Sequence, residues 1–162
     1  MARRAFFSFH YKNDVWRANQ VRNSWVTQGK EAAGFVDSAD FEKVEKEGES
    51  ATKKWIDNQL SGTSVTVVLI GSDTSNRPYV KYELQKSYDK RNGMLGVYIH
   101  KLKDKEGNTS VKGSNQFGEI GKDLNGNAVY FSTDYTCYDW VDDNGYNNMG
   151  KWIEEAAKKA GK

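Results

Sequence analysis

The segment 65–70, Val-Thr-Val-Val-Leu-Ile, constrains the fold more than any other part of the chain. Its residues are mostly β-branched, and polar and apolar positions do not alternate along it. This pattern is typical of a strand that is covered on both faces, as in a parallel sheet packed between helices. The segment 94–99 has the same character. The two segments together favour an α/β fold with a parallel sheet.

The remaining hydrophobic periodicity predicts strands and helices that alternate along the chain. This order predicts a three-layer α/β domain over 1–162, with a central, mainly parallel sheet of about five strands. No repeat or linker divides the chain. The periodicity fails over 103–127, where we predict a long loop. The predicted elements are a strand at 5–9, a helix capped by Asp14, a strand at 34–36, a helix capped by Ser50 that ends near Gly62, the strand at 65–70, a helix with Pro78 in its first turn, the strand at 94–99, a strand at 128–131 after an Asn125-Gly126 turn, and a helix over 144–160.

Charge and hydropathy exclude several classes of protein. The 24 Lys and Arg residues nearly balance the 22 Asp and Glu residues, and both signs are scattered, so no nucleic-acid partner is expected. No apolar run approaches the ~18–20 residues that cross a bilayer, and the apolar run near the N-terminus is too short for a signal peptide. A single cysteine, Cys137, excludes an internal disulfide and a multi-cysteine zinc site. We expect a cytoplasmic protein without membrane contact.

Several common catalytic and binding motifs are absent. The chain has no Gly-x-Gly-x-x-Gly after its first strand, no P-loop and no Gly-x-Ser-x-Gly elbow. His10 and His100 each follow a strand, but neither has a second ligand at metal-binding spacing. The segment 139–145 resembles a calcium loop only superficially, because Trp140 stands where the first aspartate is needed. No metal site is predicted.

Ligands of an open parallel sheet bind at the carboxyl ends of its strands. The loops that leave those ends are 8–12, 37–48, 71–77 and the segment after His100. We therefore expect any active site to be assembled from these loops.

Glu83 is the most informative single residue. In a helix beginning at Pro78 it lies at the edge of the core-facing stripe, and helical side chains tilt toward the N-terminus, here toward the strand ends. A partly buried acid there must be protonated, paired or reserved for a substrate. The alternative is an ion pair with Lys86 or Arg77 on a solvated face. Ser8 has a similar double interpretation: its hydroxyl either bonds the backbone near the strand end or lines a pocket.

Several blocks in order resemble the TIR-like proteins (Toll/interleukin-1 receptor homology) of bacterial antiphage systems, in particular the TIR subunit of Thoeris defence. The similarity spans most of the chain. The blocks are 4–11, RAFFSFHY; 16–25, WRANQVRNSW; 63–72, TSVTVVLIGS; 77–84, RPYVKYEL; and 138–147, YDWVDDNGYN.

The resemblance implies a flavodoxin-like fold and an enzyme that cleaves the nicotinamide–ribose bond of NAD⁺. NAD⁺ is then a substrate, and no permanently bound cofactor is expected. The essential glutamate of catalytic TIR domains corresponds to Glu83, and a loop of the site to 113–117, which makes Asn115 a further candidate. By position, Ser8, His10 and Tyr11 would line the pocket and Ser72 would donate to the phosphates.

In Thoeris the cleaved nucleotide becomes a diffusible signal that switches on a separate effector protein. The resemblance therefore implies that the protein acts on NAD⁺, that its product reaches a signal-responsive effector, that a phage component triggers it, and that it self-associates. Two alternatives stay open: a non-catalytic TIR-like interaction module, and an enzyme like the nucleoside deoxyribosyltransferases, which use a similar sheet and a glutamate nucleophile.

Overall fold

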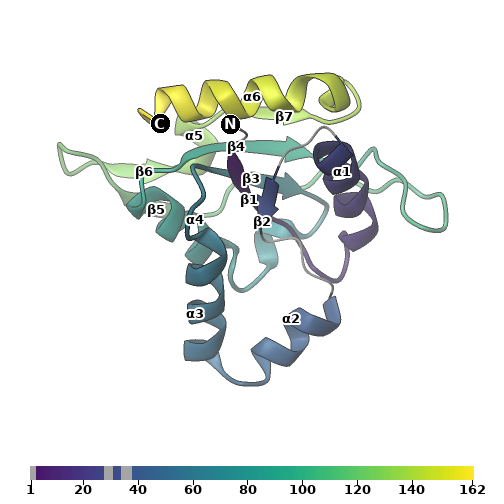
Figure 1. Ribbon diagram of the computed structural model, residues 1–162, viewed down its shortest axis with the longest axis horizontal. Coiled ribbons are helices and arrows are strands. Elements are labelled where there is room, and N and C mark those ends of the chain that lie inside the picture. Colours follow the sequence, from purple (N-terminus) through teal and green to yellow (C-terminus); the bar gives the residue numbers. More distant parts are fainter. Residues whose placement is uncertain (1–2, 28–30, 34–37) are drawn as a thin grey trace.

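The computed structural model describes residues 3–27, 31–33 and 38–162, and its core is a sheet of five parallel strands (Figure 1). The strand order is β2-β1-β3-β4-β7, and every neighbouring pair is parallel. This order is that of flavodoxin-like folds, whose direction of winding reverses between β1 and β3. The strands are β1 (Arg4–Ser8), β2 (Glu31–Ala33), β3 (Val65–Ile70), β4 (Gly93–Tyr98) and β7 (Cys137–Asp139).

Helices cover both faces of this sheet (Figure 1). Helices α1 and α6 lie on one face, and α3 and α4 lie on the other. All six residues of β3 are buried, which explains the absence of polar alternation in that segment. The helices are α1 (Val15–Thr27), α2 (Ser38–Glu45), α3 (Glu49–Leu60), the short 3₁₀ helix η1 (Thr74–Asn76), α4 (Val80–Asp89), α5 (Phe131–Asp134) and α6 (Gly145–Lys159).

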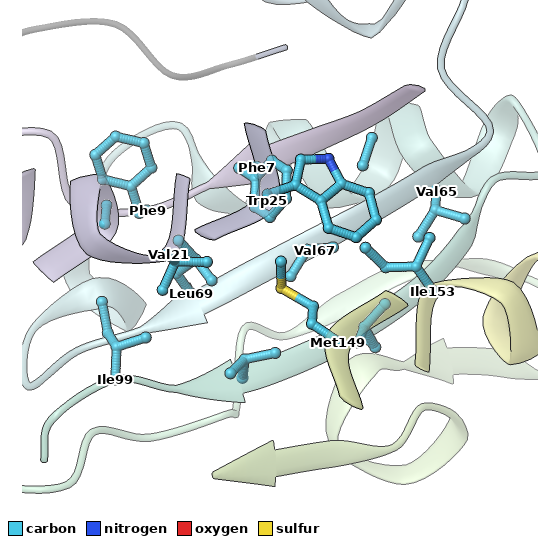
Figure 2. Close-up of a cluster of buried hydrophobic side chains, with 14 of the residues drawn as sticks. Phe7, Phe9, Val21, Trp25, Val65, Val67, Leu69, Ile99, Met149 and Ile153 are labelled. Carbon is cyan, nitrogen blue, oxygen red and sulfur yellow. The ribbon is translucent and has the colours of Figure 1, made fainter. Parts of the chain in front are cut away.

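Successive side chains of each strand point to opposite faces of the sheet. In β1, Phe7 packs toward α1 and α6, where it meets Trp25 edge-on with 6.3 Å between ring centroids. Figure 2 shows this core, with Met149 and Ile153 contributed by α6. Ser8, the next residue of β1, therefore points to the opposite face, which α3 and α4 cover. This alternation sets the position of the candidate site.

The chain between β4 and β7 forms a separate antiparallel hairpin of β5 (Glu119–Lys122) and β6 (Ala128–Tyr130). The expected Asn125-Gly126 turn is confirmed, with Gly126 at a φ of 81° that favours glycine. The strand after it, however, pairs only with β5, and the fifth strand of the main sheet is β7. Strand β7 is absent from the predicted elements because its three residues are too few to produce a sequence pattern.

Other boundaries differ from the prediction. The expected strand at 34–36 lies outside the described residues, and β2 occupies 31–33 instead. The expected loop 37–48 contains α2. Pro78 was expected within the first turn of a helix, but α4 begins at Val80 with Tyr79 as its N-cap, because η1 and a turn take up the preceding residues. Gly48, not Ser50, caps α3.

The two ends of the described chain meet beside α6 (Figure 1). Arg3 pairs through Nε with Glu154 at 2.7 Å, and its Nη2 donates to the carbonyl of Lys162 at 3.0 Å. Both ends lie at the edge where the strands begin, away from their carboxyl ends. Within the described residues, no helix is both long enough and apolar enough to span a membrane.

Candidate functional site

Ser8 is the last residue of β1 and lies next to the point where the sheet reverses its winding. It stands opposite Val68 of β3 in the register and is fully buried. Because Phe7 and Phe9 point toward α1 and α6, Ser8 is directed toward α4. Ligands of flavodoxin-like sheets bind at this position. The serine therefore places a hydroxyl at the expected site.

Glu83 lies in the first turn of α4 and reaches the same position from the helix side. Its side chain is completely buried, and its Oε1 accepts a hydrogen bond from Ser8 Oγ at 2.5 Å. The tilt of helical side chains toward the N-terminus explains this direction. The prediction that the carboxylate points toward the strand ends is thus confirmed.

Arg77 supplies the charge that faces Glu83. Its Nη2 forms an ion pair with Glu83 Oε1 and donates to Ser8 Oγ at 3.0 Å. The ion-pair alternative named the correct partner, but the pair is buried: the side chain of Arg77 is 3% exposed. Sequence reasoning missed Arg77 as a site residue. Its place in the loop after β3 was the signal that could have identified it.

Tyr11 closes the other side of the guanidinium. The Arg77 Cζ atom lies 4.8 Å from the centroid of the Tyr11 ring, a cation–π arrangement. Tyr11 in turn packs against Phe41 at 4.3 Å between centroids, so the α2 segment contributes to the wall. Ser8, Tyr11, Arg77 and Glu83 therefore form one buried cluster, named here the Glu83 cluster.

Burial and the neighbouring groups have opposite effects on the pKa of Glu83. Burial raises the pKa of Glu83 above the ordinary glutamate value, while the charge of Arg77 and the hydrogen bonds from Ser8 and Arg77 act to lower it. Burial also raises the pKa of Tyr11, and the negative charge of Glu83 adds to the effect. Tyr11 is thus a neutral phenol next to a carboxylate whose ionisation depends on Arg77.

His10 lies at the rim of the cluster. Its Nδ1 accepts from the backbone N–H of Asn13 at 3.1 Å, and its Nε2 is 3.9 Å from Asp73. Burial lowers the pKa of His10, against the opposing charges of Asp14 and Asp73. At neutral pH the ring is therefore mostly uncharged and available as a hydrogen-bonding group.

The other two predicted residues are not in contact with the Glu83 cluster. Ser72 is exposed in the loop after β3. The amide of Asn115 is directed to Cys137, with 3.7 Å between Nδ2 and Sγ. The role of Ser72 at the phosphates and that of Asn115 in the site stay predictions. No group of three metal-binding side chains occurs in the part of the chain that the structure describes.

A cavity of about 790 Å³ lies elsewhere, at the edge where the strands begin. It is lined by the start of β4, by the β5–β6 hairpin and by Trp152 of α6. The strand-end position and the buried acid, rather than the volume of a hollow, therefore identify the candidate site.

The strand order and the acid at the reversal point define a flavodoxin-like α/β protein with a polar cluster in the usual ligand position. The family "Thoeris protein ThsB, TIR-like domain" matches residues 6–104. A protein of Bacillus cereus (strain MSX-D12), named "Putative cyclic ADP-D-ribose synthase ThsB1", is 37% identical over 191 aligned positions, covering 94% of this chain and 100% of the relative. The chain belongs to this family of TIR-like Thoeris proteins.

Proposed function

We propose that the protein cleaves the bond between nicotinamide and ribose in NAD⁺ and converts the remaining nucleotide into a signal for a separate effector of antiphage defence. The observation that carries this proposal is the buried Glu83 carboxylate at the reversal point of the sheet, hydrogen-bonded by Ser8 at 2.5 Å. The name of the Bacillus relative, "Putative cyclic ADP-D-ribose synthase ThsB1", supports a product of the cyclic ADP-ribose type.

The chemistry suits a single carboxylate. When the bond from ribose C1′ to the pyridinium nitrogen breaks, its electron pair stays with nicotinamide, which leaves as a neutral molecule. The ribosyl group gains positive charge, which an adjacent carboxylate stabilises. Because the leaving group needs no proton, no separate general acid is required. Glu83 would hold the ribose through its hydroxyls and face the developing charge.

The cation must then be captured. Attack by water gives ADP-ribose and releases a proton, whereas attack by a nucleophile of the same nucleotide gives a cyclic product with the same loss of a proton. A site that excludes water favours the second outcome. The burial of the Glu83 cluster is consistent with a cyclic product.

The test is the release of nicotinamide from NAD⁺ by the purified protein, alone and with lysate of phage-infected cells, which supplies a trigger. We expect Glu83→Gln to lose activity by at least about a hundredfold. Glu49→Gln is the matched control, because Glu49 also lies in the first turn of a helix but its side chain is 71% exposed.

Undiminished activity of Glu83→Gln would remove Glu83 from the mechanism. No consumption of NAD⁺ in either condition would refute the enzymatic proposal and favour a non-catalytic TIR-like module. Exchange of bases on deoxynucleosides without any action on NAD⁺ would instead favour a deoxyribosyltransferase.

A further inference from the structure

The carboxylate of Glu83 is occupied and enclosed. Oε1 already accepts from Ser8 and from Arg77, and neither Ser8, Tyr11, Arg77 nor Glu83 is more than 5% exposed. A ribose cannot reach a carboxylate in this arrangement. Under the proposed function, on which this inference rests, one of these side chains has to move before substrate binds.

Arg77 is the side chain that can move. Ser8 is fixed in an internal strand, and Glu83 in α4, where its backbone N–H donates to Tyr79 at 3.0 Å. Arg77 belongs to neither η1 nor α4, and its long side chain is held by Ser8, Glu83 and the ring of Tyr11. Rotation about its side-chain torsions would move the guanidinium away from Glu83.

The cluster also contains polar atoms that lack partners. Among the described residues, Tyr11 Oη, Arg77 Nε and Nη1, and Glu83 Oε2 are buried without a hydrogen bond. Buried polar groups are normally satisfied, so this combination points to a ligand. The free N–H groups of a guanidinium match the oxygens of a phosphate, and a free carboxylate oxygen matches a hydroxyl. A nucleotide offers both groups.

Charge determines which ligand can open the cluster. Separating a buried guanidinium from its carboxylate leaves two unpaired charges, which is strongly unfavourable. A diphosphate compensates because it gives Arg77 a new anionic partner and leaves the Glu83 carboxylate free to bind the sugar. A nucleoside without phosphate provides no such partner.

We propose that Arg77 is the gate and the specificity residue of this site: it covers Glu83 in the free protein, and the diphosphate of a dinucleotide draws it away. The same side chain then neutralises the phosphates next to the carboxylate. The site thereby admits nucleotides and rejects nucleosides that carry the same glycosidic bond.

The kinetic test compares NAD⁺ with nicotinamide riboside, which has the same scissile bond and no phosphate. In the wild type we expect a much higher kcat/KM for NAD⁺. Arg77→Gln should reduce this ratio by about tenfold, because KM for NAD⁺ rises and the riboside is cleaved faster. This size of effect is expected if Arg77 covers Glu83 in at least about nine-tenths of the free wild-type molecules. Using the ratio cancels any change in the ionisation of Glu83, which affects both substrates.

Arg77→Lys keeps the charge without the fork of donors and should restore part of the selectivity. Arg22→Gln, an exposed arginine of α1, should match the wild type. An unchanged ratio in Arg77→Gln would overturn the gate. Wild-type activity in Glu83→Gln would instead overturn the proposed function, so the two failures are distinguishable.

A second measurement requires neither turnover nor a variant. The ¹H–¹⁵N resonance of Arg77 Nε is followed by NMR while the wild type is titrated with ADP-ribose, and then with ribose alone. We expect ADP-ribose to shift this resonance and ribose to leave it in place. An Arg77 Nε chemical shift that stays unchanged at saturating ADP-ribose would overturn the proposal.

Discussion

Ser8 Oγ lies 2.5 Å from Glu83 Oε1, although the two residues are 75 positions apart in the chain. The parallel sheet makes this contact possible. Strands β1 and β3 are neighbours in the sheet, although α2 and α3 lie between them in the sequence. The hydrogen bond joins the end of a central strand to the first turn of a helix, and the following predictions depend on it.

Replacing Ser8 by alanine should weaken both folding and activity. The buried Glu83 oxygen loses one of its two donors, so we expect the free energy of unfolding to fall by about 1–3 kcal/mol. Nicotinamide release should fall by about tenfold, since the carboxylate is less well oriented. Denaturant unfolding and the NAD⁺ assay measure the two effects. Ser50→Ala, at an exposed position of α3, is the control, and an equal effect there would contradict the assignment.

The rate of NAD⁺ cleavage should rise with pH through a pKa above the ordinary glutamate value of about 4.3. Under the proposed function the ionised form of Glu83 is the active one, and burial raises its pKa against the opposing effect of Arg77. A pH–rate profile of kcat/KM checks this. A value of kcat/KM that has already reached its upper plateau at about pH 4 would contradict the prediction.

The same group should make stability depend on pH. Because the folded state holds the Glu83 proton more tightly than the unfolded state, its favourable contribution is complete below the unfolded pKa and is lost as pH rises through the raised folded pKa. The effect is read from the difference between wild type and Glu83→Gln in unfolding free energy across pH. A difference that stays constant would show that the pKa is not raised.

Gly113→Ala should destabilise the protein, because a Cβ at this position would collide with the backbone carbonyl of Gly71. We expect a loss of about 1–3 kcal/mol, since a backbone atom cannot move aside easily. Gly150→Ala is the contrasting variant. Beyond its own helix, the nearest atom to the new Cβ would be in Trp25, 3.9 Å away, and alanine stabilises the interior of α6 by up to about 1 kcal/mol relative to glycine. Thermal unfolding of both variants tests the pair.

Arg17→Ala should loosen the loop after β4. Arg17 donates from Nε to the carbonyl of Leu102 at 2.8 Å and from Nη2 to that of Asn108 at 2.9 Å, and it pairs with the buried Asp14. Its loss leaves a buried carboxylate without its partner, at a cost of about 3 kcal/mol. Hydrogen exchange should become faster across 102–110. Arg22→Ala should leave that exchange unchanged.

The parallel sheet and the direction of Glu83 were predictable because both follow from local periodicity. The unbroken apolar segments required a sheet covered on both sides, and the helical tilt placed Glu83 at the strand ends. The family resemblance pointed to the same residue independently.

Three features were not predictable, each for a physical reason. Strand β7 has three half-buried residues, too few to produce a pattern, and it is specified by its neighbour β4. The start of α4 was misplaced because Pro78 suits a turn as well as a first helical turn. Arg77 was overlooked because it is buried by Ser8 and Tyr11, which are distant along the chain. Arginine is rarely buried, so its sequence position alone does not predict burial.

The contact of Arg3 with Glu154 and with the carbonyl of Lys162 has a practical consequence. A short linker could join the two ends, and the chain could be reopened at the exposed Asn125-Gly126 turn to give a circular permutant. Such a rearranged protein would keep Ser8, Arg77 and Glu83 on one uninterrupted stretch of polypeptide. It would also offer an attachment point for a reporter at the hairpin tip, remote from the carboxylate.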